Sequence, residues 1–211
     1  MQSPEIYWSR VAREKAFTHP LRTDWLSPLV SEDRAVLDLG CGYGRLTAEL
    51  ARSGWRRALG ADTAAGMIER AREEHPSLDF RHLPVGPLPF EDASFGAVLL
   101  FAVLTCVPDN EDQESLIAEC ERILAPGGVL YVSDLLLQSD ERNRARYAKE
   151  ESPERQGTFE LPEGVRLRHF TRTRLESLFA AFDELRFEPF EVVTMNGHRA
   201  DAFQYIGRRA E

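Results

Sequence analysis

A chain of 211 residues, with 43% hydrophobic and 29% charged residues, is long enough for one α/β domain with a full core and short for two. Its formal net charge of −9 gives a field that repels nucleic acid, so we expect no nucleic-acid partner. The opening MQSPEIYWSR lacks a basic stretch followed by an apolar run, and the longest apolar run, 97–104, is far too short to span a bilayer. We therefore expect a cytoplasmic protein without a membrane partner.

Residues 1–30 are expected to form a helical arm ahead of the main fold. The pattern indicates a helix from residue 3, a break at His19-Pro20 and then a second short helix. Aromatic side chains recur along both segments, and such residues most often pack onto the main domain. Those of the arm are Tyr7, Trp8, Phe17 and Trp25.

Between residues 35 and 137, short apolar runs alternate with segments of helical periodicity. The expected strands are 35–39, 58–61, 78–82, 95–101 and 129–137. Residues 95–101 are almost continuously apolar, as a strand buried on both faces should be. Strands and helices in this alternation predict an α/β fold, with a doubly wound, mostly parallel sheet and helices on both faces.

The pattern changes in residues 138–211. The expected elements are a polar helix at 139–149, a loop or lid at 152–168, a helix at 173–182 and two strands at 184–193 and 201–207. The last two strands are joined through Asn196-Gly197, a dipeptide typical of tight hairpins. The sequence thus predicts a parallel sheet that ends in an antiparallel hairpin.

A glycine-rich turn, 40–44, directly follows the first expected strand. Glycines in this place let the backbone turn sharply into a helix and approach a ligand closely, although they can also serve a tight turn alone. A nicotinamide-binding loop reads GxGxxG, whereas this chain has Arg45 at the third glycine position. Two acids accompany the loop, because Asp38 precedes it and Asp62 ends the second expected strand. Their conjunction predicts a ligand site at this edge of the sheet.

The segments VLDLGCGYGRL, GADTAAGMIERAR, LPFEDASFGAVLL and ILAPGGVLYVSD resemble, in this order, the successive motifs of class I S-adenosylmethionine-dependent methyltransferases. The resemblance covers residues 35–134, together with the C-terminal helix and hairpin. It implies one Rossmann-like methyltransferase domain over 1–211, with a cofactor-binding core at 35–137. It also implies a seven-stranded sheet whose last strand is antiparallel and inserted between strands five and six. The implied cofactor is S-adenosyl-L-methionine, and the product S-adenosyl-L-homocysteine.

The resemblance further implies which residues contact the cofactor. They are Asp38, Gly40, Cys41 and Gly42 for the methionine moiety, Asp62 for the ribose, Thr63 and Met67 beside the adenine, and Phe101 through its backbone. A carboxylate suits the ribose because it can accept both hydroxyl groups, as acids do in dinucleotide folds. Asp38 either orients the glycine loop or meets the ammonium group of the cofactor.

Two departures from the family pattern concern details of this site. The family has an acid before the LPF motif for the adenine amino group, but this chain reads His82-Leu83-Pro84-Val85. Adenine recognition would then rest on the backbone of Val85 and on apolar packing. The family's SFD becomes Ser94-Phe95-Gly96, which removes an acid that more often supports structure than contacts ligand.

Methyl transfer from a sulfonium is a direct displacement with a good leaving group, so alignment and exclusion of water can supply most of the catalysis. A general base is needed only where the nucleophile arrives protonated. His169 is the best candidate for such a base, and Tyr147, on the expected polar helix, is the second catalytic candidate. Arg142 and Arg146 lie one helical turn apart on that helix and indicate a solvated face.

The acceptor is expected outside the carboxyl ends of the strands, where the N-terminal and C-terminal arms meet. The candidate acceptor-binding residues are Tyr7, Trp8, Cys106, Asn196 and His198. Each has a plainer alternative: packing for the aromatic residues, a small buried apolar group for Cys106, and an ordinary turn for the last two. The cysteines are odd in number and form no CxxC pair, so we expect no metal site and no disulfide framework.

The leading hypothesis is therefore methyl transfer to a small-molecule acceptor, an anionic metabolite being one candidate. RNA or protein methylation is a first alternative, which the net acidity disfavours. A cofactor-binding protein without turnover is a second, and a nicotinamide oxidoreductase is a third, which Arg45 disfavours. The sequence indicates neither the accepting atom nor the oligomeric state.

Overall fold

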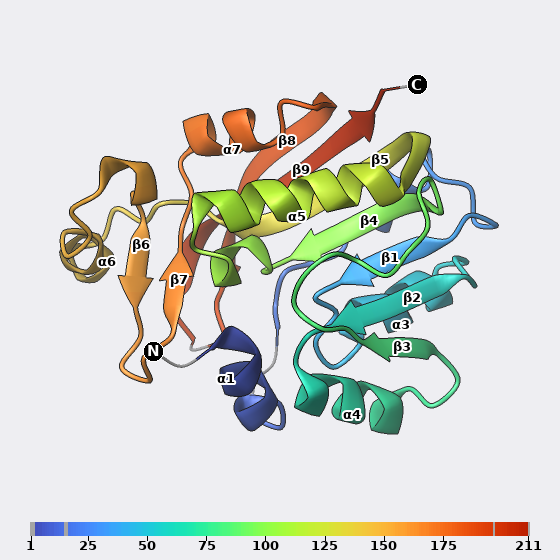
Figure 1. Ribbon diagram of the computed structural model, residues 1–211, viewed down its shortest axis with the longest axis horizontal. Helices are drawn as coiled ribbons and strands as arrows, with labels where there is room; N and C mark the ends of the chain where they lie inside the picture. Colours follow the sequence, from blue (N-terminus) through green and yellow to red (C-terminus); the bar gives the residue numbers. More distant parts are fainter. Residues whose placement is uncertain (1–2, 15–16, 196, 211) are drawn as a thin grey trace.

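Seven strands form one sheet in the order β3-β2-β1-β4-β5-β9-β8 (Figure 1). The computed structural model describes residues 3–14, 17–195 and 197–210. The strands are β1 (Val36–Leu39), β2 (Ala58–Asp62), β3 (Asp79–His82), β4 (Phe95–Phe101), β5 (Leu124–Leu135), β8 (Phe182–Val193) and β9 (Arg199–Arg209). The first five pair in parallel, whereas β9 is antiparallel to both of its neighbours, β5 and β8. The expected α/β sheet with an inserted antiparallel last strand is confirmed.

The central strand β4 shows why both faces of the sheet are covered. Every residue of β4 is buried. Because successive side chains of a strand point to opposite faces, Val98 and Leu100 join one apolar cluster and Leu99 and Phe101 join another. Full burial of each such side chain stabilises the fold by about 1.5–3 kcal/mol. A strand that is apolar at every position therefore requires a layer of helices on each side.

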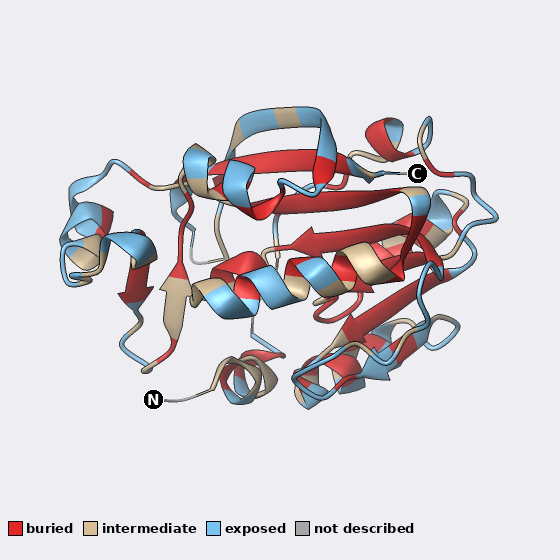
Figure 2. Ribbon diagram, turned by 45° about the horizontal axis from the view of Figure 1, so that its top comes forward, coloured by how far each residue is buried: buried red, intermediate tan, exposed pale blue. Residues whose placement is uncertain are grey.

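Helices supply those two layers. α5 (Asn110–Ile123) and α7 (Arg172–Leu178) cover one face, and α2 (Thr23–Leu26) and α3 (Arg45–Arg52) cover the other (Figure 1). α4 (Ala65–Glu74) packs against the edge strand β3. Figure 2 shows buried residues filling the central strands, while the edge strand β8 and the outer side of α5 are largely exposed. Among the described residues, no helix combines the length and apolarity needed to cross a membrane.

The elements outside the central alternation gather at the carboxyl ends of the parallel strands (Figure 1). They are α1 (Pro4–Val11), α6 (Glu141–Tyr147), β6 (Thr158–Glu160) and β7 (Arg166–Arg168). The break expected at His19-Pro20 separates α1 from α2. The two arms that flank the central fold therefore meet at one end of the sheet.

The segment 152–168, expected to be a loop or lid, contains two short strands. Strands β6 and β7 pair there as a two-stranded antiparallel sheet. Pro162 and Gly164 fall in its turn, where Gly164 has a φ of 81°. Phe159 and Val165 are buried, and Val165 packs against Tyr7 and Val11 of α1. The proline and glycine thus mark only the turn, while buried side chains on either side hold the strands in place.

Candidate functional site

A cavity of about 1550 Å³ lies at the carboxyl ends of the parallel strands. Its lining includes the last residue of each of four parallel strands: Leu39 of β1, Asp62 of β2, Phe101 of β4 and Leu135 of β5. Its other walls include residues of α1, α6 and the β6–β7 hairpin. Ligand cavities usually measure about 300–1,000 Å³, so this one has room for two small molecules side by side.

The glycine loop forms one wall of the cavity. Gly40, Gly42 and Gly44 have φ values of 76°, 55° and 83°, a region that favours glycine. A Cβ atom added to Gly42 would lie 2.6 Å from Cε2 of Phe17, and one added to Gly40 would lie 2.4 Å from Cγ2 of Val103. Glycine is therefore required both by the turn and by the close approach of these side chains.

Asp62 ties the glycine loop to the start of α4. Its Oδ2 accepts a hydrogen bond from the Gly42 N–H at 2.8 Å, and its Oδ1 accepts one from the Ala64 N–H at 2.8 Å. Burial raises the pKa of this carboxyl, and the backbone N–H groups oppose that rise. Each carboxylate oxygen can accept a second hydrogen bond, so Asp62 retains acceptor capacity toward the cavity that it lines.

Asp38 and Cys41 lie behind the loop and do not line the cavity. The Asp38 carboxylate is buried and accepts a hydrogen bond from Oγ1 of Thr47 in α3 at 2.7 Å. Burial raises the pKa of Asp38 to about 6. Burial also raises the pKa of the Cys41 thiol. Of the two functions that the sequence allowed Asp38, this placement favours orienting the loop.

Aromatic side chains of the N-terminal arm cover the glycine loop. The Phe17 ring stacks on Tyr43, with centroids 5.5 Å apart, and Trp8 meets Phe17 edge to face at 5.8 Å. Tyr7, Trp8 and Phe17 all line the cavity. The Trp8 indole N–H lies near Cys106 and is buried without a hydrogen-bond partner among the described residues. The arm therefore forms part of the site as well as packing on the fold.

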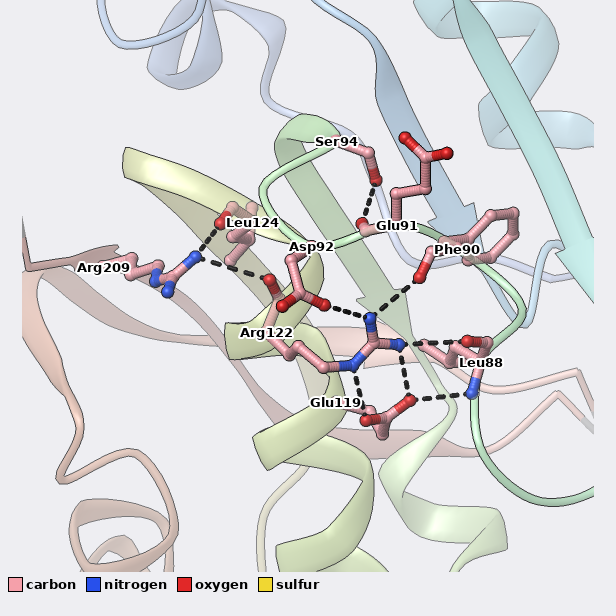
Figure 3. A network of polar contacts seen from close by, with 9 residues as sticks. All are labelled: Leu88, Phe90, Glu91, Asp92, Ser94, Glu119, Arg122, Leu124 and Arg209. Atoms are coloured by element: carbon pink, nitrogen blue, oxygen red, sulfur yellow. Dashed lines mark hydrogen bonds and ion pairs between the residues drawn. The ribbon is translucent and has the colours of Figure 1, made fainter.

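Thr63, Met67 and Val85 line the cavity next to Asp62, on the side where the resemblance places the adenine. Val85 is 74% exposed and belongs to the segment between β3 and β4. Arg122 of α5 fastens this segment by donating hydrogen bonds to the carbonyl oxygens of Leu88 at 3.0 Å and Phe90 at 2.8 Å (Figure 3). The backbone around Val85 is therefore anchored from α5 while its side chain stays accessible.

His169 and Tyr147 form a short hydrogen bond on the opposite side of the cavity. Tyr147 Oη lies 2.6 Å from His169 Nδ1 and accepts a hydrogen bond from the Gln138 N–H at 3.2 Å. Among the described residues, His169 Nδ1 is the only hydrogen-bond acceptor for the Tyr147 hydroxyl, so we infer that the hydroxyl donates to Nδ1 and that the ring proton of His169 lies on Nε2. His169 lines the cavity, whereas Tyr147 stands behind it. In this tautomer Nε2–H is a hydrogen-bond donor, and the catalytic function of His169 stays a prediction.

The charge around His169 is positive. Burial, and then Arg146 and Arg142, lower the pKa of His169 to about 4, so the ring is neutral at pH 7. Both arginines line the cavity, and neither forms an ion pair with a carboxylate among the described residues. By contrast, Arg166 is paired with Glu150 at 3.4 Å. Two guanidinium groups thus border the cavity without a counter-charge in contact.

Thr105 and Cys106 follow β4 and also line the cavity. Asp134, which is fully buried at the end of β5, accepts a hydrogen bond from the Thr105 N–H at 3.0 Å and holds this turn. Burial raises the pKa of Cys106 to about 12, so it is a thiol at neutral pH. The Thr105 hydroxyl is buried and has no hydrogen-bond partner among the described residues. His198 lines the cavity too, and Asn196 lies outside the described residues.

His19 is a lining residue that sequence reasoning missed. It is only 7% exposed, and its Nδ1 lies 2.8 Å from Oγ of Ser133 in β5. The sequence marked His19 only as part of a helix break, because its partner Ser133 is 114 positions away. No local pattern could have found this pair.

Comparison with known proteins finds similarity to one family over the glycine loop and the first five strands of the sheet. A family model described as a methyltransferase domain matches residues 37–132. A probable S-adenosylmethionine-dependent methyltransferase of Mycolicibacterium smegmatis is 38% identical over 100 residues, which cover 47% of this chain and 37% of that protein. N-demethylindolmycin N-methyltransferase of Streptomyces griseus is 34% identical over 46% of this chain and 42% of its own length.

A ubiquinone biosynthesis O-methyltransferase of Xanthomonas oryzae is 36% identical over 56% of this chain and 50% of its own length. The chain therefore spans half or less of the length of these curated relatives. The similarity to one solved structure extends further. An S-adenosylmethionine-dependent methyltransferase from Methanosarcina mazei has a TM-score of 0.82 and 27% identity, and the match covers 91% of this chain and 99% of that one.

Proposed function

The chain belongs to the class I S-adenosylmethionine-dependent methyltransferases, and from this premise we propose that it transfers the methyl group of S-adenosylmethionine to a small-molecule acceptor. One observation carries the proposal: the cavity that begins at the glycine loop continues, without a partition, to the two arms. Its volume of about 1550 Å³ suits a cofactor and a small acceptor together. The small-molecule methyltransferases among the relatives support the class of acceptor.

The cofactor would lie along the glycine loop and Asp62. Gly40 and Gly42 line the cavity, and the turn that they form would let the backbone approach the methionine moiety. The remaining lone pairs of Asp62 would accept the ribose hydroxyls, and Met67 and the Val85 backbone would border the adenine. When bound, S-adenosylmethionine supplies an electrophilic methyl group on a sulfonium. This chain's residues orient it and exclude water.

The acceptor would lie between α1, α6 and the β6–β7 hairpin. The His169 Nε2–H and the guanidinium groups of Arg142 and Arg146 offer donors and positive charge, which suit a carboxylate or phosphate on the acceptor. Tyr147 would act by positioning the His169 ring. Tyr7, Trp8, Cys106 and His198 border the same space. The acidic net charge of −9 disfavours RNA as the acceptor.

Transfer of labelled methyl groups tests this proposal. The protein is incubated with methyl-labelled S-adenosylmethionine and a metabolite extract, and the products are separated into small-molecule, protein and RNA fractions. We expect label in a low-molecular-weight product, with a heat-inactivated sample as the control. Label found only in the protein or RNA fraction would show that the acceptor is a protein or an RNA, which contradicts the proposed class of acceptor. Cofactor binding without any labelled product would indicate a binding protein without turnover.

Removal of the His169 side chain is expected to lower activity toward the acceptor without changing the affinity for the cofactor. His169→Gln should lower kcat/KM for an anionic acceptor about tenfold or more, because a hydrogen bond to a charged group contributes about 1.5–3 kcal/mol. Tyr147→Phe should have a smaller effect, since the imidazole remains but its Nδ1 partner is lost. Affinity for S-adenosylhomocysteine should not change in either variant. Steady-state kinetics and calorimetry on the same preparations measure both quantities.

His75→Gln is the matched control, because His75 directly follows α4 and does not line the cavity. It should leave both quantities at their wild-type values. If His169→Gln and Tyr147→Phe both keep wild-type kcat/KM, these residues are structural and the acceptor lies nearer Thr105 and Cys106.

A further inference from the structure

The His19 ring is held at the place where β4 and β5 meet the cavity. Its partner Ser133 lies opposite Phe101, the last residue of β4, in the β4–β5 pairing. The backbone next to the ring is fastened from two sides. The His19 carbonyl accepts a hydrogen bond from Arg45 at 2.6 Å, and the Pro20 carbonyl accepts one from Gln204 at 2.6 Å. The imidazole is thus fixed on a segment that has no regular secondary structure.

The contacts of Ser133 assign the protonation of this ring. Ser133 Oγ lies 3.1 Å from the Phe203 carbonyl oxygen, to which only the hydroxyl can donate. A hydroxyl has one proton, so the contact of 2.8 Å with His19 is a hydrogen bond only if Nδ1–H donates to Oγ. His19 Nε2 then carries a free lone pair, and it has no hydrogen-bond partner among the described residues.

His19 and His169 both line the cavity, and their Nδ1 contacts assign opposite protonation to their free Nε2 atoms. His169 offers Nε2–H as a donor, because Tyr147 occupies its Nδ1 with a proton. His19 offers an unprotonated Nε2, because Ser133 occupies its Nδ1 as an acceptor. Only the His19 nitrogen can take up a proton without first losing one.

We propose that His19 Nε2 accepts the proton of the methyl acceptor, and that this acceptor is a hydroxyl compound, either an alcohol or a phenol. The proposal rests on the proposed function. In the step, a lone pair of the hydroxyl oxygen forms the new bond to the methyl carbon. The electrons of the broken carbon–sulfur bond go to sulfur, and the hydroxyl proton goes to Nε2. The products are a methyl ether, neutral S-adenosylhomocysteine and the His19 imidazolium, which returns its proton to water.

The environment of His19 suits a hydroxyl better than an amine. Burial, and then Arg45, lower the pKa of His19 to about 4, so the ring is an uncharged, weak base at pH 7. Arg45 is the charged group that acts on it, while Ser133 and the Phe190 ring, 6.1 Å away, are neutral. A hydroxyl becomes strongly acidic as its oxygen is methylated, so a weak base suffices. A basic amine arrives as a cation and would need a stronger base than this one.

The ring tautomers can be measured without knowing the acceptor. Long-range ¹H–¹⁵N NMR spectra of ¹⁵N-histidine-labelled protein distinguish Nδ1–H from Nε2–H rings, and single His→Gln variants assign the five histidines. We expect the Nδ1–H form for His19 and the Nε2–H form for His169. Ser133→Ala should shift His19 toward a mixture of tautomers and leave His169 unchanged. A wild-type His19 ring protonated on Nε2 overturns the proposal.

The rate of methyl transfer tests the catalytic function of His19. His19→Gln should lower the single-turnover rate on the hydroxyl acceptor about 100-fold or more, the range typical of general bases, with unchanged affinity for S-adenosylhomocysteine. Ser133→Ala, which keeps the imidazole, should fall between His19→Gln and wild type. His75→Gln is the control and should match wild type.

A wild-type rate in folded His19→Gln overturns the proposal, as does an acceptor methylated on an amine nitrogen. Failure of the proposed function would be distinguished by the behaviour of the wild-type protein. In that case the wild-type protein itself binds no S-adenosylhomocysteine or forms no labelled product, whatever the tautomer of His19.

Discussion

Replacement of Asp62 by alanine is expected to weaken the binding of S-adenosylhomocysteine at least tenfold. Two hydrogen bonds from the ribose to a charged acceptor would be lost, each worth about 1.5–3 kcal/mol. The substitution also leaves the N–H groups of Gly42 and Ala64 without the carboxylate that now holds each at 2.8 Å. The glycine loop would therefore become less ordered, in addition to the loss of the ribose contacts. Isothermal titration calorimetry measures the affinity.

Asp62→Asn separates these two contributions. Its amide oxygen can still accept one of the two N–H groups but carries no charge. We expect an affinity between those of Asp62→Ala and wild type, and a circular dichroism spectrum like that of wild type for both variants. An unchanged dissociation constant in folded Asp62→Ala would show that Asp62 does not bind the ribose.

Gly42→Ala is expected to abolish most of the cofactor affinity, again by more than tenfold. Alanine at a φ of 55° is strained by about 1–2 kcal/mol, and its Cβ would lie 2.6 Å from the Phe17 ring. The loop or the aromatic cover must move, and either movement disturbs the wall that the cofactor is proposed to contact. Calorimetry with S-adenosylhomocysteine and urea unfolding measure affinity and stability separately.

Gly127→Ala is the matched control for this substitution. Gly127 has a comparable φ of 72°, but a Cβ added there meets nothing within 4 Å. It should lose about 1–2 kcal/mol of stability through backbone strain and retain full cofactor affinity. If Gly42→Ala also keeps its affinity, the close approach at Gly42 has no part in cofactor binding.

The parts of the fold that the sequence predicted correctly are those with a local signal. The apolar run of β4 reflects burial on both faces, and Asn196-Gly197 lies between the two strands that pair as β8 and β9. The two strands within 152–168 were not predicted because β6 and β7 span only three residues each. Such short strands have no readable alternation, and they are held by burial of Phe159 and Val165 against distant parts of the chain.

The candidate site divides in the same way. The cofactor half has a local signal, because 38–44 and Asp62 lie at the ends of the neighbouring strands β1 and β2. The acceptor half depends on pairs far apart in the sequence, such as His19 with Ser133 and Tyr147 with His169. His169 was a candidate from the sequence, but its inferred protonation depends on the Tyr147 hydroxyl, 22 positions away. Long-range hydrogen bonds thus decide the chemistry that local motifs leave open.

Calorimetric titration of the wild-type protein with S-adenosylhomocysteine and, separately, with NADH tests the central claim most directly. The glycine loop with Arg45 at the third glycine position, together with Asp62, predicts micromolar binding of S-adenosylhomocysteine and no binding of NADH. Binding of NADH without binding of S-adenosylhomocysteine or S-adenosylmethionine would contradict the account.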